Sequence, residues 1–221
     1  EAAERGFRAD VEGVRVRLDG KLPELDLESL RGRLEGSYKT GAWTLAGRKV
    51  ELQAADGMRI EPTDFQIAWQ QDARSGRVPG SATASILDLA MLGRLAGYLP
   101  LDARSRELLE RHQPQGRLTG LRAGWGRAGE ALDQYSLRAT FAGLGLLADG
   151  YFPGANGLAG QVEFDEKGGS LSLDASKSGI SLPAVFVDPG FAFDQLRARA
   201  TWKVAGENVD VKLERLQRLQ R

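Results

Sequence analysis

The sequence has no cysteine, a single histidine and no excess of either charge, and each shortage excludes a class of function. Without cysteine there can be no disulfide, thiolate nucleophile or Cys-ligated metal, although the redox compartment stays open. The 30 basic and 30 acidic side chains cancel. No long-range field therefore attracts a phosphate backbone, and we expect no nucleic-acid partner.

Catalytic groups are also scarce. Any Ser-His-Asp triad or two-histidine metal site would depend on His112 alone. Its place at the end of a helical pattern favours a residue that interacts with the helix dipole. The acidic pairs Asp26 with Glu28 and Asp165 with Glu166 lie in or beside predicted turns, where we interpret them as solvated. We expect no catalytic residue, no cofactor and no metal site.

No long hydrophobic run is present. The longest mostly apolar stretch, residues 86–99, contains Asp88 and Arg94 and is shorter than the roughly 20 residues of a membrane-spanning helix. No signal peptide is visible at the start of the chain. We therefore expect a soluble segment whose membrane anchor lies outside it.

Alternation of apolar and polar residues is the main positive signal, and its period of two is typical of half-buried strands. Gly, Asn and Asp punctuate the breaks between runs, which is turn chemistry. Most breaks are too short for the crossover helix that parallel strands need, so we predict antiparallel hairpins and meanders. The clearest runs are residues 14–18, 65–69, 161–164, 171–174 and 209–213.

One interval has helical spacing instead. Its leucines recur every three or four residues, at Leu89, Leu92, Leu95 and Leu99, with Asp88 as a plausible N-cap and Pro100 as a stop. A second short helix is predicted from about residue 102 to just before residue 114. The chain thus divides into a β-rich section (1–85), a helical hairpin insert (86–114) and a second β-rich section (115–221), which together form one elongated module.

Two stretches resemble each other. Residues 158–164 and 196–202 share a Leu-x-small-x-apolar-x-aromatic pattern at an offset of 38 residues, with a weaker echo at 30–34. Self-similarity at a fixed period indicates stacked supersecondary units, and hence an elongated shape.

The apolar strand faces need a cover, which can be a second sheet, a helix or an apolar ligand. The predicted hairpin is too short to cover every strand. A folded-over sheet would supply the rest, and acyl chains in a curved groove would do so equally. The aromatic residues of the strand patterns are interpreted as core or cross-strand anchors. They are Trp43, Trp69, Trp125, Trp202, Phe141 and Phe164.

Over roughly residues 80–213 the sequence resembles the YhdP family of AsmA-like envelope proteins. The spaced patterns that carry the resemblance are residues 88–89, 98–101, 107–109, 112–118, 121 and 125, followed by 152–154, 157–160, 169–173 and 182–186. The C-terminal segment departs from the family pattern. There Leu213, Leu216 and Leu219 recur every third residue, with Arg215, Arg218 and Arg221, in a spacing unlike a strand.

The resemblance implies a section of a bridge-type lipid carrier in the periplasm, within a protein anchored in the inner membrane. It implies a mainly β fold, an elongated, twisted antiparallel sheet curled into an open groove. Our hypothesis adds the inserted helical hairpin as a lid, plug or packing element. Phospholipid would be the main partner, beside the remainder of the same chain and other envelope proteins. The residues expected to line the groove are Ile67, Trp69, Val162, Phe164, Leu171, Leu173, Ile180 and Leu182, and the lid helix would carry Leu89, Leu92, Leu95 and Leu99.

Two alternatives stay open. A β-repeat scaffold that binds another envelope protein without conducting lipid would use its exposed strand edges for pairing. An enzyme acting on polysaccharide would need two carboxylates facing one cleft, about 5 to 10 Å apart, and no pair in the sequence can be placed so.

Overall fold

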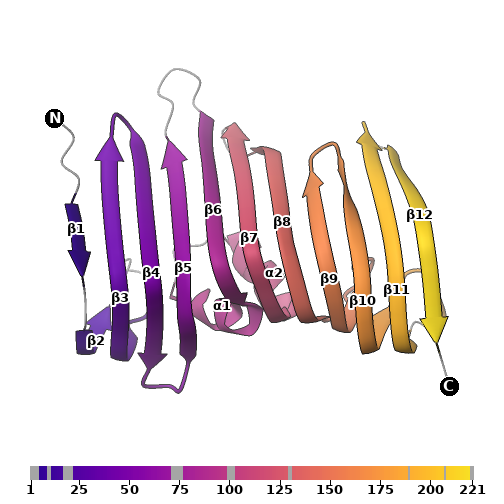
Figure 1. Cartoon of the computed structure of the whole chain (residues 1–221), viewed down its shortest axis with the longest axis horizontal. Helices are drawn as coiled ribbons and strands as arrows, with labels where there is room; N and C mark the ends of the chain where they lie inside the picture. The colour runs from indigo at the N-terminus through magenta and orange to yellow at the C-terminus, as the bar shows by residue number, and fades with distance from the viewer. Residues whose placement is uncertain are drawn as a thin grey trace.

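The computed structural model describes residues 5–8, 11–16, 22–70, 77–98, 103–128, 131–188, 190–206 and 208–219. Within these ranges the chain forms one open antiparallel sheet of 12 strands and two short helices, which confirms the predicted mainly β fold (Figure 1). The strands are β1 (Arg5–Arg8), β2 (Val11–Val16), β3 (Leu25–Lys39), β4 (Ala42–Ala54), β5 (Arg59–Gln70), β6 (Arg77–Asp88), β7 (Gln115–Ala128), β8 (Ala131–Leu146), β9 (Gly154–Asp165), β10 (Gly168–Ser181), β11 (Gly190–Ala205) and β12 (Asn208–Leu219).

The sheet is a meander in which each strand from β3 to β12 pairs with the next. Strands β1 and β2 both pair with β3, β1 with residues 33–36 and β2 with residues 25–30, so they share one position in the sheet. The described sheet is therefore eleven positions wide. At a spacing of about 4.8 Å between strands, its width is about 48 Å.

Tight turns join several of the strands where the sequence predicted them. Thr40 and Gly41, between β3 and β4, have φ of 48° and 80°. Such positive values suit a two-residue hairpin turn, whose twist matches that of the flanking strands. At the β4–β5 turn the Asp56 carboxylate accepts a hydrogen bond from the Met58 N–H at 2.9 Å. The predicted turn at Asp19 lies outside the described residues.

The strands bend. Positive φ values inside them coincide with shifts of pairing register, as at a β-bulge, which bends a strand and adds one residue to it. In Figure 1 the lower parts of the strands turn away from the viewer, toward the side on which the helices lie. We call this concave side the inner face and the opposite side the outer face. The bending positions are Lys49, Gly120, Gly143, Gly157 and Lys177.

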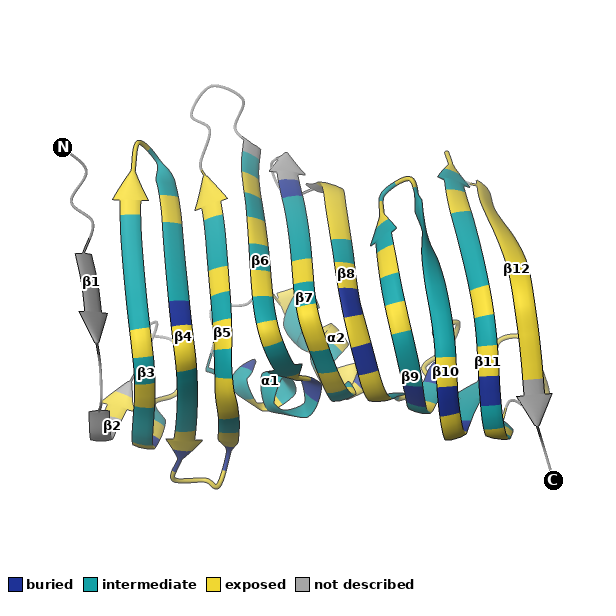
Figure 2. Ribbon diagram, viewed as in Figure 1, coloured by how far each residue is buried: buried dark blue, intermediate teal, exposed yellow. Residues whose placement is uncertain are grey.

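The core lies at this bend. Phe141, Leu158, Ala175 and Leu196, from β8 to β11, form one buried cluster. Because the bulge resets the alternation, Leu144, three residues after Phe141, also packs against this cluster. Figure 2 shows the buried positions of these strands near their lower ends, whereas the upper parts are more exposed.

The helical hairpin interrupts the meander between β6 and β7. Helix α1 (Leu89–Leu95) follows β6 directly, and the predicted N-cap is confirmed because the Asp88 carboxylate accepts a hydrogen bond from the Met91 N–H at 3.0 Å. Helix α2 (Ala103–His112) confirms the second predicted helix. Pro100, the predicted stop of the first helix, lies outside the described residues.

The expectation that the C-terminal Leu/Arg segment departs from strand structure is wrong. Strand β12 continues through it and pairs with β11 as far as Leu219. A register shift between Arg199 and Ala200 places Leu213 opposite Ala200 and Leu216 opposite Ala198. The bulge thus absorbs the three-residue spacing and keeps both leucines on one face.

The internal similarity has a simple structural origin. Its two copies lie on β9 and β11, two positions apart in the sheet and running in the same direction. Leu158 and Leu196, the first residues of the pattern, both belong to the core cluster. Phe164 and Trp202, the last residues, both pair with Gly169 of β10. The offset of 38 residues is thus one full hairpin of the meander.

Candidate functional site

The pairing register assigns every strand residue to one of two faces, because directly paired residues point to the same side of a sheet. One row across the sheet is apolar from β4 to β12, and the next row, one residue away, is polar from β5 to β12. The apolar row consists of Leu45, Ile67, Ala82, Ala123, Leu137, Phe164, Gly169, Trp202 and Val211. The polar row consists of Gln66, Thr83, Arg122, Arg138, Glu163, Ser170, Thr201 and Lys212.

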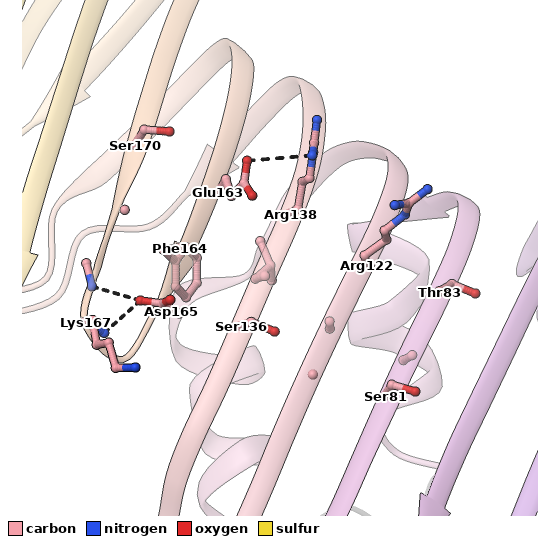
Figure 3. A pocket seen from close by; sticks show the side chains of 16 residues that line it. Ser81, Thr83, Arg122, Ser136, Arg138, Glu163, Phe164, Asp165, Lys167 and Ser170 are labelled. Carbon is pink, nitrogen blue, oxygen red and sulfur yellow. Dashed lines mark hydrogen bonds and ion pairs between the residues drawn. The ribbon is translucent and has the colours of Figure 1, made fainter.

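The apolar row belongs to the inner face. Val162 and Leu171, which pair with each other near this row, pack against the buried cluster at the bend. In Figure 3, Thr83, Arg122 and Arg138 of the polar row are seen with the helices behind the strands. The molecule is therefore a trough with a polar outside and an apolar inside.

Most of the residues predicted to line a groove lie together on this inner face. Ile67 and Trp69 come from β5, Val162 and Phe164 from β9, and Leu171 and Leu173 from β10. Ile180 also comes from β10, beyond the bend, and packs against the core cluster. Leu182 lies outside the strand, in a turn where its carbonyl accepts hydrogen bonds from the N–H groups of Val185 and Phe186.

The residues predicted for a lid helix have different surroundings. Leu89 is buried at the start of α1. Leu92 and Leu95 line a hollow of about 550 Å³ between α1 and the lower parts of β5 and β6. Leu99 lies outside the described residues. The other apolar residues around this hollow are Ile60, Ile86, Leu87 and Met91.

Beside this hollow, β5 and β6 lack regular main-chain pairing. Their ladder runs only from Phe65 to Trp69 of β5. Below it, side chains replace the ladder: Thr63 Oγ1 donates to the Ile86 carbonyl at 2.7 Å, and Ser85 Oγ accepts from the Asp64 N–H at 2.9 Å. The main-chain pairing is thus interrupted beside the point where α1 leaves the sheet.

An ion pair joins helix α1 to the β4–β5 turn. The Arg94 guanidinium donates to the Asp56 carboxylate at 2.9 Å and to the Asp56 carbonyl at 3.2 Å. The hydrogen bond from the Met58 N–H is the main cause that lowers the pKa of Asp56 below its ordinary value; desolvation opposes it, and the hydrogen bond and charge of Arg94 lower the pKa further. Asp56 therefore stays ionised at neutral pH.

The C-terminal end of helix α2 contacts the segment that follows β8. The Leu147 N–H donates to the His112 carbonyl at 2.8 Å, and His112 Nδ1 lies 3.1 Å from the Leu147 carbonyl. The imidazole packs against the Phe152 ring at 4.1 Å between centroids. Arg111 pairs with Asp149 at 3.1 Å. His112 is a buried anchor, and its described contacts include no carboxylate or hydroxyl.

The largest hollow, about 770 Å³, spans β6 to β10 and is drawn in Figure 3. Its polar side chains belong to the outer face by strand alternation. Among them Arg138 and Glu163 form an exposed ion pair at 3.8 Å. An exposed pair of this kind contributes little binding energy, so we assign no site to this depression.

Within the described part of the chain, no group of three or more His, Cys, Asp or Glu residues is arranged to hold a metal ion. Likewise, no helix in that part is long and apolar enough to cross a membrane. Sequence reasoning missed Met58, which is fully buried at the β4–β5 turn, because an apolar residue beside Gly57 gives no periodic signal. Trp43 and Trp69, interpreted from the sequence as core or cross-strand anchors, pair with each other across β4 and β5 and are exposed on the inner face, where Trp69 was expected.

An open antiparallel meander that is apolar inside and polar outside defines the chain as a β-groove protein. A family model described as YhdP protein matches residues 6–220, so the chain belongs to the YhdP family. The family is related to lipid transport, of bridge type, and is not known for an enzymatic activity. Searches of curated proteins and of solved structures gave no significant match.

Proposed function

We propose that the inner face carries phospholipid acyl chains across the periplasm, as one section of a groove that leads from the inner to the outer membrane. The observation that carries the proposal is the unbroken apolar row from β4 to β12. Large apolar side chains on that face are exposed to solvent, among them Trp43, Trp69 and Leu213. Exposed apolar surface on this scale is typical of a face that binds a partner or a ligand.

Lipid fits this face better than a protein partner does. The strands cross the long axis of the sheet, so the apolar row runs along the trough from β4 to β12, a length of about 38 Å. A groove this long exceeds the hydrocarbon core of a bilayer, about 30 Å, but is too short to bridge two membranes alone. The remainder of the protein would extend it, anchored in the inner membrane.

The helical hairpin has a place in this proposal. It is tethered at Asp56 on one side and at Leu147 on the other, so it lies across the inner face over the middle strands. Acyl chains that pass this section would meet α1, whose Leu92 and Leu95 border the hollow at β5 and β6. We propose that the hairpin narrows the groove as a lid or plug.

The test is a pair of charge variants on one strand. Leu171 and Leu173 face the inside of β10, whereas Ser170 and Ser172, their immediate neighbours, face outside. Leu171→Glu with Leu173→Glu should abolish binding of phospholipid, because a carboxylate in the path of acyl chains is costly to desolvate. Ser170→Glu with Ser172→Glu should bind lipid like the parent.

Bound lipid is measured by native mass spectrometry, and folding by circular dichroism. Equal lipid binding in both variants contradicts the proposal. The proposal is also contradicted if the parent retains no lipid and only the Leu171 and Leu173 variant unfolds. These leucines are then ordinary core residues.

A further inference from the structure

A row of aromatic side chains follows one rim of the trough. All its members lie on the inner face, within four residues of the upper end of their strand. The row includes all four tryptophans of the chain. We call it the aromatic rail, and it consists of Tyr38, Trp43, Trp69, Trp125, Tyr135, Phe164 and Trp202.

Cross-strand pairing makes the rail continuous. Trp43 pairs with Tyr38 on one side and with Trp69 on the other, with ring centroids 4.5 Å and 6.1 Å apart. Farther along, the Phe164 ring lies 6.2 Å from that of Tyr135 and 6.4 Å from that of Trp202. Centroid distances of this size are those of interacting aromatic pairs.

Two glycines complete the rail. Gly80 lies between Trp69 and Trp125 in the pairing, and a Cβ added there would be only 2.2 Å from the Trp125 ring. Gly169 lies between Phe164 and Trp202, and its Cβ would be 2.5 Å from the Trp202 ring. Each indole thus occupies the space that a side chain at the glycine would need.

Exposure falls from the rail to the bend. On β8 it falls from 37% at Tyr135 to 4% at Phe141, and on β11 the half-buried Trp202 is followed toward the bend by the buried Leu196. Trp and Tyr have an apolar ring body and a polar tip, and they gather where an apolar phase meets water. The rail has this environment, and the bend is the dry end of the same face.

The distance between the two levels matches a lipid monolayer. From Trp202 to Leu196 on β11, as from Phe164 to Leu158 on β9, the strand runs for six residues, or about 20 Å. Half of the hydrocarbon core of a bilayer is about 15 Å. A phospholipid with its ester groups at the rail would therefore place the ends of its acyl chains near the bend.

We propose that the aromatic rail sets the orientation of the transported phospholipid, with glycerol and head group held at this rim and both tails directed toward the bend. The inference rests on the proposed function and adds to it the contact residues and the direction of the lipid. A lipid can pass from one ring to the next, because a ring face binds a glycerol ester without a fixed hydrogen-bond geometry.

Intrinsic fluorescence tests this directly, because every tryptophan lies on the rail. The chain is loaded with phosphatidylcholine that carries a nitroxide quencher on the head group, near the carboxyl end of one acyl chain, or near its terminal methyl group. The loss of fluorescence should be greatest for the first two positions and least for the terminal methyl. Equal loss at all three, or the greatest loss from the terminal methyl, overturns the proposed orientation.

A matched reporter near the bend provides the control. Leu173 pairs with Gly160 and Ala198, so Leu173→Trp finds room over a small neighbour, as Trp125 does over Gly80. With the four native tryptophans changed to phenylalanine, this reporter should be quenched most by the terminal-methyl nitroxide. If this reporter is instead quenched least by the terminal-methyl nitroxide, as expected for the rail tryptophans, the inference is also contradicted.

Binding of the same labelled lipid is measured separately, by mass spectrometry. Absence of bound lipid contradicts the proposed function, and the inference falls with it. Lipid that is bound without the expected order of quenching contradicts the inference alone.

Discussion

Gly80 offers a sharp test of how the inner face is packed. A Cβ at this position would lie 2.2 Å from Trp125 Cε2 and 2.3 Å from Cζ2. Carbon atoms in contact need about 3.5–4.0 Å, so the indole must move by more than an ångström. We expect Gly80→Ala to destabilise the chain by about 1–3 kcal/mol. For a chain of this size, the thermal midpoint should fall by about 2–12 °C.

The matched control is Gly36→Ala on β3. Gly36 pairs with Leu45 and so lies on the same inner face, but the nearest atom to its added Cβ is the Thr44 carbonyl oxygen at 3.9 Å. This contact is ordinary, so we expect a change within about 0.5 kcal/mol. Thermal unfolding followed by circular dichroism measures both variants.

A double variant isolates the cause. Once Trp125→Ala has removed the indole, adding Gly80→Ala should cost less than about 0.5 kcal/mol, because the clash is gone. The same cost in both backgrounds would refute the reasoning, since Gly80 would then be required for some reason other than room for the ring.

Two further predictions concern the bend and the α1 tether. Leu196→Ala should cost about 2–5 kcal/mol in urea unfolding, because Leu196 is buried in the core cluster, whereas Leu213→Ala, on the exposed part of the same face, should change stability by at most about 0.5 kcal/mol. Comparable costs for the two would contradict the placement of the core. The lowered pKa of Asp56 contributes stability above its unfolded pKa, and this contribution is lost as pH falls through the lowered folded value. The free energy of unfolding of Asp56→Asn should therefore be lower than that of the parent at neutral pH and approach it in acid. A difference independent of pH would show that the carboxylate charge and its ion pair with Arg94 do not stabilise the turn.

The relative direction of neighbouring side chains was predictable within a run of unbroken alternation, because it depends only on the local period of two. One such case is the run from Ser170 to Leu173. A period of two assigns its leucines and its serines to opposite faces, whatever the rest of the chain does. The N-cap at Asp88 was equally local, since it needs only a carboxylate three residues before a free N–H.

The height of a residue along its strand was not predictable. Trp43 and Trp69 belong to one row only because the β4–β5 register pairs them, and that register depends on a bulge at Lys49 and on the turn at Asp56. Alternation alone therefore identified an apolar face but left open whether its tryptophans lie in a core or anchor cross-strand pairs. The bulges themselves carry a weak signal, because a lysine with positive φ looks like any other lysine in the sequence.

A sheet with one bare apolar face raises the question of what keeps it folded, and the bend supplies the answer. Where strands curve inward, side chains from neighbouring strands converge, so Phe141, Leu158 and Leu196 bury one another without a second sheet. Above the bend the strands are straighter and the same face stays open, held by main-chain pairing and by contacts between aromatic rings of neighbouring strands. The chain thereby separates the residues that stabilise the fold from those free to contact a moving ligand, and substitutions at the bend and at the rail should affect different properties.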